Sequence, residues 1–188
     1  MPHPRLLSLC ALLLAASPLR AQQYDVLIIG GTVYDGTGSP GRSADVGIRG
    51  DRIVFVGKAP ARVTATQRID AKGLIVSPGF IDPHTHAYEG LPRLNATRRQ
   101  NASSLMQGIT TVVLGADGRG PVDVAKTLDE SERAGLGTNT YVMAGFGTVR
   151  SKVMGSSSAP ATKAQIDSMR ALITQAMREG AFGVGSGL

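Results

Sequence analysis

Cysteine, tryptophan and histidine are scarce in this chain. Its 188 residues include one cysteine, no tryptophan and three histidines. The cysteine, Cys10, lies in an N-terminal segment that we expect to be removed. A mature chain without cysteine has no disulfide and no thiolate ligand, so any metal must be held by nitrogen and oxygen atoms. After His3, the only histidines are His84 and His86.

Aromatic residues are also few, at 4% of the sequence, although the formal net charge is +6. The basic residues are scattered and are not interleaved with aromatic side chains, which argues against a nucleic-acid groove. We therefore expect a solvated basic surface and no nucleic-acid partner.

The longest apolar run is short and lies near the N-terminus. Arg5 precedes apolar residues 6–16, and Leu19-Arg20-Ala21 ends in a small residue, as at a signal-peptide cleavage site. The run is too short to span a bilayer as a stable helix. We predict a signal peptide over residues 1–21, no stable membrane anchor, and export to the periplasm or the extracellular space.

Residues 22–77 show the pattern of a small all-β unit, with Gly50-Asp51 as a hairpin turn. Gly36, Gly38 and Gly41 have the spacing of a dinucleotide-binding motif. We do not expect such a site, because the motif requires a helix at the glycines, whereas Pro40 interrupts the segment and another strand follows. The expected strands are 24–32, 44–49, 52–56, 63–70 and 74–77.

From Pro78 onward, the pattern changes to alternating strands and helices, which is typical of βα units around a parallel sheet. A capping box at Thr162 begins the last expected helix, which continues to about Gly180. Residues 147–161, rich in small side chains, are expected to form a long loop and a potential lid. The expected strands are 79–84, 109–115, 140–144 and 181–185, and the other expected helices are 98–107 and 121–134.

The first of these strands ends in Asp82-Pro83-His84-Thr85-His86. Because side chains alternate along a strand, His84 and His86 are expected on one face, with Asp82 on the same face and deeper. Two imidazoles at a strand end suit a shared zinc ion or a related metal.

The motif Gly79-Phe80-Ile81-Asp82-x-His84-x-His86 resembles the first barrel strand of the metal-dependent amidohydrolase superfamily. The flanking segments, from about Tyr24 to Leu188, are similar to the N-acyl-D-amino-acid deacylase (D-aminoacylase) branch. The resemblance implies the N-terminal part of a small β-sandwich, followed at residues 78–188 by the first four units of a (β/α)8 barrel of the TIM type.

The resemblance also implies one or two zinc ions at the carboxyl ends of the barrel strands, with His84 and His86 as ligands. Asp117 occupies the strand-two position of a bridging anion in this branch, and Asp82 is expected to orient a histidine. The aspartate that moves protons is expected beyond Leu188, so no catalytic acid or base is assigned within this chain.

A second segment carries the branch resemblance. Residues 144–155 are similar to a Gly-His-Gly-Thr-Val-Arg…Val-Met-Gly pattern, but Phe146 replaces its histidine. Arg150 is retained, and a guanidinium binds carboxylates through two hydrogen bonds. We therefore expect Arg150 to bind the substrate carboxylate, although an arginine in a structural ion pair is equally compatible with the sequence.

The implied activity is hydrolysis of N-acyl-D-amino acids to a carboxylate and a D-amino acid by a zinc-activated water. Dihydroorotase- and hydantoinase-like enzymes are disfavoured, because strand four has no lysine. Isoaspartyl-dipeptidase-like activity stays open. A different alternative is an incomplete, non-catalytic chain or a half-barrel that needs a partner chain, since a closed barrel requires eight strands.

Overall fold

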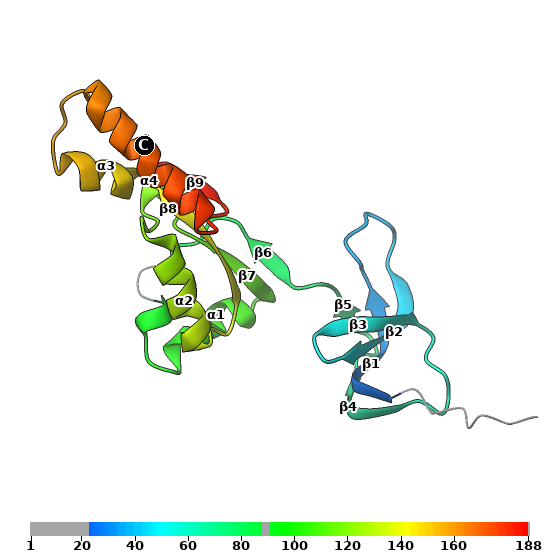
Figure 1. The fold of residues 1–188 in the computed structure, drawn as a ribbon. Coiled ribbons are helices and arrows are strands. Elements are labelled where there is room, and N and C mark those ends of the chain that lie inside the picture. The colour runs from blue at the N-terminus through cyan, green and yellow to red at the C-terminus, as the bar shows by residue number, and fades with distance from the viewer. Residues whose placement is uncertain (1–22, 88–90, 188) are drawn as a thin grey trace, which may run out of the picture. The chain divides into compact units, whose positions relative to one another are not determined.

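The computed structural model describes residues 23–87 and 91–187, and the predicted signal peptide lies outside this part of the chain. The chain divides into two compact units, one ending at Pro78 and one beginning at Gly79. Figure 1 shows the two units, which are described separately below.

The N-terminal unit is one mixed five-stranded sheet with the order β3-β2-β1-β4, in which β5 also pairs with β1. β1 and β2 are antiparallel, as are β2 and β3, whereas β4 and β5 run parallel to β1. Gly50 and Asp51 form the turn between β2 and β3, as the hairpin signal predicted. The strands are β1 (Gln23–Val33), β2 (Arg42–Arg49), β3 (Arg52–Gly57), β4 (Thr64–Asp70) and β5 (Ile75–Val76).

Two small apolar clusters stabilise this sheet. Tyr24, Leu27 and Val63 form one, and Val33, Ala44 and Val46 form the other. The Asp45 carboxylate links β1 to the segment that follows β3. It accepts hydrogen bonds from the backbone N–H groups of Gly30 (2.8 Å) and Ala59 (2.8 Å).

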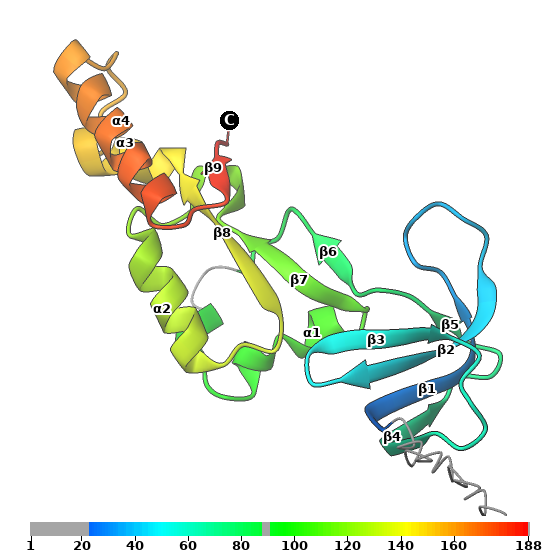
Figure 2. The ribbon, with the colours of Figure 1, turned by 45° about the vertical axis from the view of Figure 1, so that its right-hand side comes forward.

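The C-terminal unit contains a four-stranded sheet with the order β6-β7-β8-β9, and all three pairings are parallel. Figure 2 shows the strands side by side in this order. The sheet is curled, like the first half of a barrel, which confirms the predicted fold class. The strands are β6 (Phe80–Asp82), β7 (Ile109–Leu114), β8 (Asn139–Gly145) and β9 (Gly183–Gly185).

One face of this sheet packs against helices. Val112 and Leu114 of β7 and Val142 and Ala144 of β8 form a core with Val124, Ala176 and Ala181. Period-two alternation along the strands gives this face its apolar residues. The longer helices are α2 (Val124–Ala134), α3 (Phe146–Met154) and α4 (Lys163–Arg178), and the shorter ones are η1 (Leu91–Arg93), η2 (Arg98–Gln100), α1 (Ala102–Leu105) and η3 (Ala116–Gly118).

The predicted loop over residues 147–161 is wrong in its first half, which folds as α3. Val149 is fully buried, and α3 packs against α4. The apolar spacing of Phe146, Val149 and Val153 fits one helical face, which outweighs the glycine, serine and threonine content of the segment. The predicted capping box at the start of α4 is confirmed: Thr162 and Gln165 bond each other's backbone N–H groups.

The predicted helix over residues 98–107 is also largely wrong. Asn101 adopts a left-handed conformation (φ 51°) and separates η2 from the single turn of α1. α2 begins at Val124, three residues later than predicted, because the Asp123 side chain caps it by accepting the Lys126 N–H.

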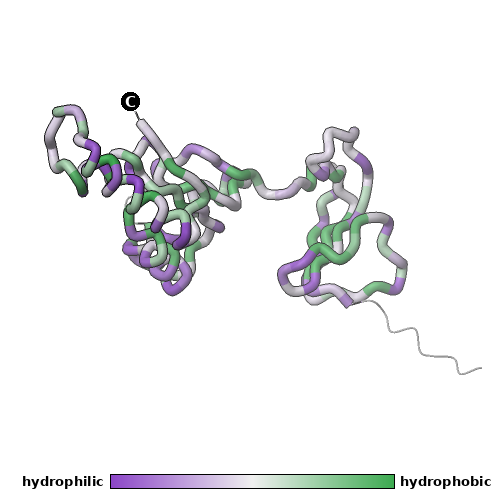
Figure 3. The backbone as a smooth tube through the Cα atoms, turned by 45° about the horizontal axis from the view of Figure 1, so that its top comes forward, coloured by the Kyte–Doolittle hydropathy of each residue, from purple (hydrophilic) through white to green (hydrophobic). Residues whose placement is uncertain are grey.

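In Figure 3 green and purple stretches alternate along both units of the chain. Within the described residues, no helix has the length and apolar character needed to cross a bilayer.

Candidate metal centre

The two histidines lie directly after β6, at the carboxyl end of the sheet. The strand ends at Asp82, whose Oδ1 accepts a hydrogen bond from the backbone N–H of His84 (3.0 Å). This two-residue turn fixes the start of the His84–His86 segment. The two imidazole rings lie close together, with centroids 5.6 Å apart.

Asp117 reaches the same place from the neighbouring strand. It lies in η3, immediately after β7, and β7 is parallel to β6, so both strands end at one edge of the sheet. One oxygen of Asp117, Oδ2, lies 3.2 Å from His84 Nε2 and 3.3 Å from His86 Nε2. The structure therefore brings Asp117 to two histidines that precede it by 31 and 33 residues along the chain.

The backbone of Asp117 is unusual. It has φ 55° and ψ 31°, in the left-handed region. This conformation costs an L-residue roughly 1–2 kcal/mol, and aspartate is among the few residues that tolerate it. Non-glycine residues with a left-handed backbone are concentrated at functional sites, where the surrounding structure holds them in this conformation. At Asp117 the conformation turns the carboxylate toward the two imidazoles.

These three residues form a group with the composition of a metal site. Their nitrogen and oxygen donor atoms all lie within 4.8 Å of one another, and no other such group of three is found in residues 23–87 and 91–187. The side chains are open to solvent, with exposed fractions of 59%, 71% and 42% for His84, His86 and Asp117. A ligand can therefore reach the group directly.

The remaining predicted site residues lie elsewhere. The Asp82 carboxylate contacts the backbone of His84 and is not part of the three-residue group. Arg150 lies on α3, where its Nη2 donates to the carbonyl oxygen of Ala159 (3.3 Å). With Phe146 and residues of α4, Arg150 lines an open pocket of ≈ 480 Å³.

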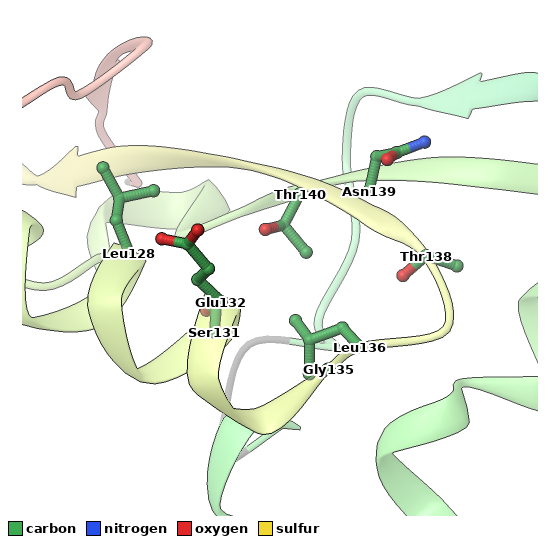
Figure 4. Close-up of a pocket in the computed structure, with 8 residues that line it drawn as sticks. All are labelled: Leu128, Ser131, Glu132, Gly135, Leu136, Thr138, Asn139 and Thr140. Carbon is green, nitrogen blue, oxygen red and sulfur yellow. The ribbon is translucent and has the colours of Figure 1, made fainter. Parts of the chain in front are cut away.

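A second hollow lies at the other end of the sheet. It has a volume of ≈ 340 Å³ and lies between α2 and the first residues of β8. Figure 4 shows Leu128, Ser131 and Glu132 on the helical side and Thr138 and Thr140 on the strand side. In barrels of parallel strands, active sites lie at the carboxyl ends, whereas this hollow lies at the amino end. The geometry therefore favours the His84–His86–Asp117 edge as the site.

Comparison with known proteins agrees with this architecture. Residues 67–187 match the profile described as "Amidohydrolase family". The chain belongs to the amidohydrolase family. The matched segment contains all of β6 to β9, and with them His84, His86 and Asp117.

Two of the similar curated proteins are deacylases. The D-aminoacylase of Alcaligenes xylosoxydans xylosoxydans is 37% identical over 190 residues, covering 89% of this chain and 38% of its own length. The N-acyl-D-aspartate deacylase of the same organism is 36% identical, covering 88% and 37%. This amidohydrolase chain thus spans under two fifths of the length of these relatives.

A solved structure gives the same relationship. An N-acyl-D-glutamate deacylase from Bordetella bronchiseptica, crystallised with zinc and a phosphonate that mimics the tetrahedral intermediate, superimposes with a TM-score of 0.78. It is 31% identical and covers 89% of this chain and 39% of its own.

Sequence reasoning missed the glycines that surround Asp117. Several backbone segments from η3, β8 and β9 meet so closely that a Cβ atom would collide with a neighbouring backbone atom. The glycine content of residues 115–120 and 183–187 was a visible signal, but the contacts between these segments depend on the fold.

Proposed function

We propose that this chain is the N-terminal part of a metal-dependent amide hydrolase that acts on N-acyl-D-amino acids. The observation that carries the proposal is the meeting of His84, His86 and Asp117 at the carboxyl edge of a parallel sheet. The similarity to three deacylases of N-acyl-D-amino acids supports the reaction class and the substrate class.

The donor set fits zinc. Zinc is bound by histidine nitrogen and carboxylate oxygen at about 2.0–2.2 Å, so neighbouring donors of a tetrahedral site lie roughly 3.3–3.6 Å apart. The two distances to Asp117 Oδ2, 3.2 and 3.3 Å, match the lower end of this range. The second oxygen of the Asp117 carboxylate could ligate a second ion, and a similar D-aminoacylase structure is described with a binuclear metal centre.

Each residue then has a distinct part. His84 and His86 would offer neutral Nε2 atoms, and Asp117 would offer a carboxylate placed between them. Asp82 would hold the start of the histidine segment through the His84 N–H. A divalent metal bound here would lower the pKa of a water ligand and polarise the amide carbonyl.

The remaining groups that this reaction needs are proposed to lie beyond Leu188. Such a reaction requires a residue that takes up and returns a proton. Among the described residues, the site contains one carboxylate, Asp117, and we assign it to the metal. We therefore propose that the aspartate that transfers protons lies after Leu188. That part of the protein would correspond to the region of the relatives that this chain does not cover.

The test is a comparison of substrates with the full-length protein. N-acetyl-D-amino acids should be hydrolysed far faster than their L-isomers, cyclic ureides or isoaspartyl dipeptides, and a chelator should abolish the activity. The variant with His84→Ala and His86→Ala should lose bound zinc. Unchanged zinc content in that variant, or a preference for cyclic ureides, would contradict the proposal.

Arg150 is proposed to bind the free carboxylate of the substrate. Its guanidinium has one hydrogen bond to Ala159 and lies at a pocket lined by apolar side chains of α4. Arg150→Ala in the full-length protein should raise KM about 10-fold or more, because a charged hydrogen bond contributes roughly 1.5–3 kcal/mol. Arg170→Ala, on the opposite wall of the same pocket, is the control. Unchanged KM and kcat for Arg150→Ala would refute this role.

We also propose that the protein is exported. The basic start, the apolar run and the small residue at Ala21 support this, although they lie outside the described residues. N-terminal sequencing of the secreted or periplasmic protein should begin near Gln22. Recovery of the intact N-terminus in the cytosol would contradict export.

A further inference from the structure

The loop that carries Asp117 is held by backbone contacts that leave no room for side chains. A Cβ atom at Gly187 would lie 2.6 Å from the carbonyl oxygen of Asp117 and 3.0 Å from its carbonyl carbon. A Cβ atom at Gly185 would lie 2.5 Å from the carbonyl oxygen of Gly115. Real Cβ atoms do not approach backbone atoms so closely, so a larger residue at either position would force the loop to move.

The same loop is also held from the side of β8. A Cβ atom at Gly145, the last residue of β8, would lie 2.5 Å from the carbonyl oxygen of Gly118. η3 therefore packs against the paired ends of β8 and β9 and contacts both. Figure 2 shows the end of β9 beside the end of β8.

The conformation of Asp117 supplies an independent observation. Its left-handed backbone is unfavourable by itself, so the surrounding contacts must hold it. One of the close approaches on the β9 side, at Gly187, is made to the backbone of Asp117 itself. A shift of this backbone by a few tenths of an ångström or more would carry Oδ2 away from both Nε2 atoms, which lie 3.2 and 3.3 Å away.

We infer that Gly185 and Gly187 are positioning residues of the metal site. Because they have no side chain, the end of β9 packs closely against the Asp117 loop and thereby holds the carboxylate between His84 and His86. β9, the fourth strand of the parallel sheet, has no metal-ligating side chain at its end and contributes to the site through close backbone contact. The inference rests on the metal site proposed above.

Three glycine-to-alanine variants of the full-length protein test it. Neither Gly185 nor Gly187 has a positive φ, so replacement by alanine adds a methyl group without straining the backbone conformation. Gly187→Ala and Gly185→Ala should each weaken zinc binding by about 10- to 100-fold, the effect typical of groups that orient a ligand. Gly183→Ala is the matched control on the same strand, because its Cβ would meet only the Met143 side chain, at 3.6 Å.

The readouts are zinc affinity, measured by competition with a chelator, and the visible spectrum of the cobalt-substituted protein. The spectrum should change in Gly187→Ala and stay the same in Gly183→Ala. Wild-type affinity and spectrum in both Gly185→Ala and Gly187→Ala would overturn the inference.

A double-mutant cycle separates positioning from general destabilisation. If Gly187 acts through Asp117, then Gly187→Ala should have no further effect on zinc affinity in an Asp117→Ala background, because coupled residues are not additive. Equal losses in both backgrounds would overturn the inference. If Asp117→Ala alone leaves zinc binding unchanged, the proposed metal site itself fails, which is a different result.

Discussion

The three clustered side chains show how much of a metal site can be predicted from single residues. Alternation along a strand predicted that His84 and His86 share one face. The structure places their rings 5.6 Å apart, but β6 ends at Asp82, so the two histidines lie after the strand and not within it. Asp117 was expected at the end of the next strand, and it lies beside both histidines. Spacing succeeds here because parallel neighbouring strands end at the same edge.

Other features at the residue scale could not be predicted. The left-handed backbone of Asp117 and its contact with Gly187 join segments 70 residues apart, and only the folded chain shows which glycine meets which carbonyl. The contact of Arg150 with Ala159 likewise depends on α3, which the sequence did not predict.

Two substitutions of Asp117 separate its effect on zinc binding from its effect on the stability of the fold. Asp117→Gly and Asp117→Ala should both bind zinc more weakly, but they should differ in stability. In the metal-free protein, alanine should be less stable than glycine by about 1 kcal/mol, because only glycine adopts the left-handed backbone freely. Chemical denaturation of the two variants measures this difference. Equal free energies of unfolding would show that the backbone of residue 117 relaxes, against the geometry described.

At the scale of elements, the sequence predicted strands better than helices. All four strands of the parallel sheet were expected within three residues of their observed ends, because buried parallel strands form continuous apolar runs. The helix over residues 98–107 was not formed, since Asn101 breaks it, and α3 was missed because its burial comes from contact with α4. Tertiary contacts of this kind are absent from local sequence patterns.

The N-terminus of α2 depends on a carboxylate from a distant part of the chain. Glu179, just after α4, accepts hydrogen bonds from the backbone N–H groups of Val124 (2.9 Å) and Ala125 (3.2 Å). The hydrogen bond from the Gln175 side chain, followed by the one from Ala125, lowers the pKa of Glu179 below its usual 4.5. The negative charge also suits the positive end of the helix dipole.

This pKa shift predicts how stability changes in acid. A carboxylate with a lowered folded-state pKa contributes stability above its unfolded pKa, and the contribution is lost as the pH falls through the folded value. Glu179→Gln should therefore lower the melting temperature at pH 7 and flatten its fall below about pH 4.5. Glu132→Gln, an exposed change on α2, is the control. The same pH profile in wild type and Glu179→Gln would contradict the role of this cap.

At the scale of the whole chain, the parallel sheet has open edges. β6 and β9 are the outer strands, and on β6 the side chains of Phe80 and Ile81 are 61% and 62% exposed. Exposed apolar edge strands promote pairing between molecules. This feature agrees with a chain that spans 38% of the length of a D-aminoacylase relative.

The predicted mature chain, from Gln22 to Leu188, should therefore self-associate and bind a hydrophobic dye when it is produced alone. Replacing Phe80 and Ile81 by lysine should reduce the association, because charged residues on an edge strand oppose pairing. Size-exclusion chromatography and dye fluorescence measure both effects. A soluble monomer that binds no dye would contradict this expectation and favour a self-sufficient half-barrel.

We propose that His84, His86 and Asp117 hold a metal ion. Anomalous diffraction at the zinc edge, from crystals of the full-length protein, tests this proposal. We expect an anomalous peak about 2.0–2.2 Å from Nε2 of His84, Nε2 of His86 and a carboxylate oxygen of Asp117. A zinc-loaded crystal with no peak at this position, or with its zinc bound by other residues, would contradict it.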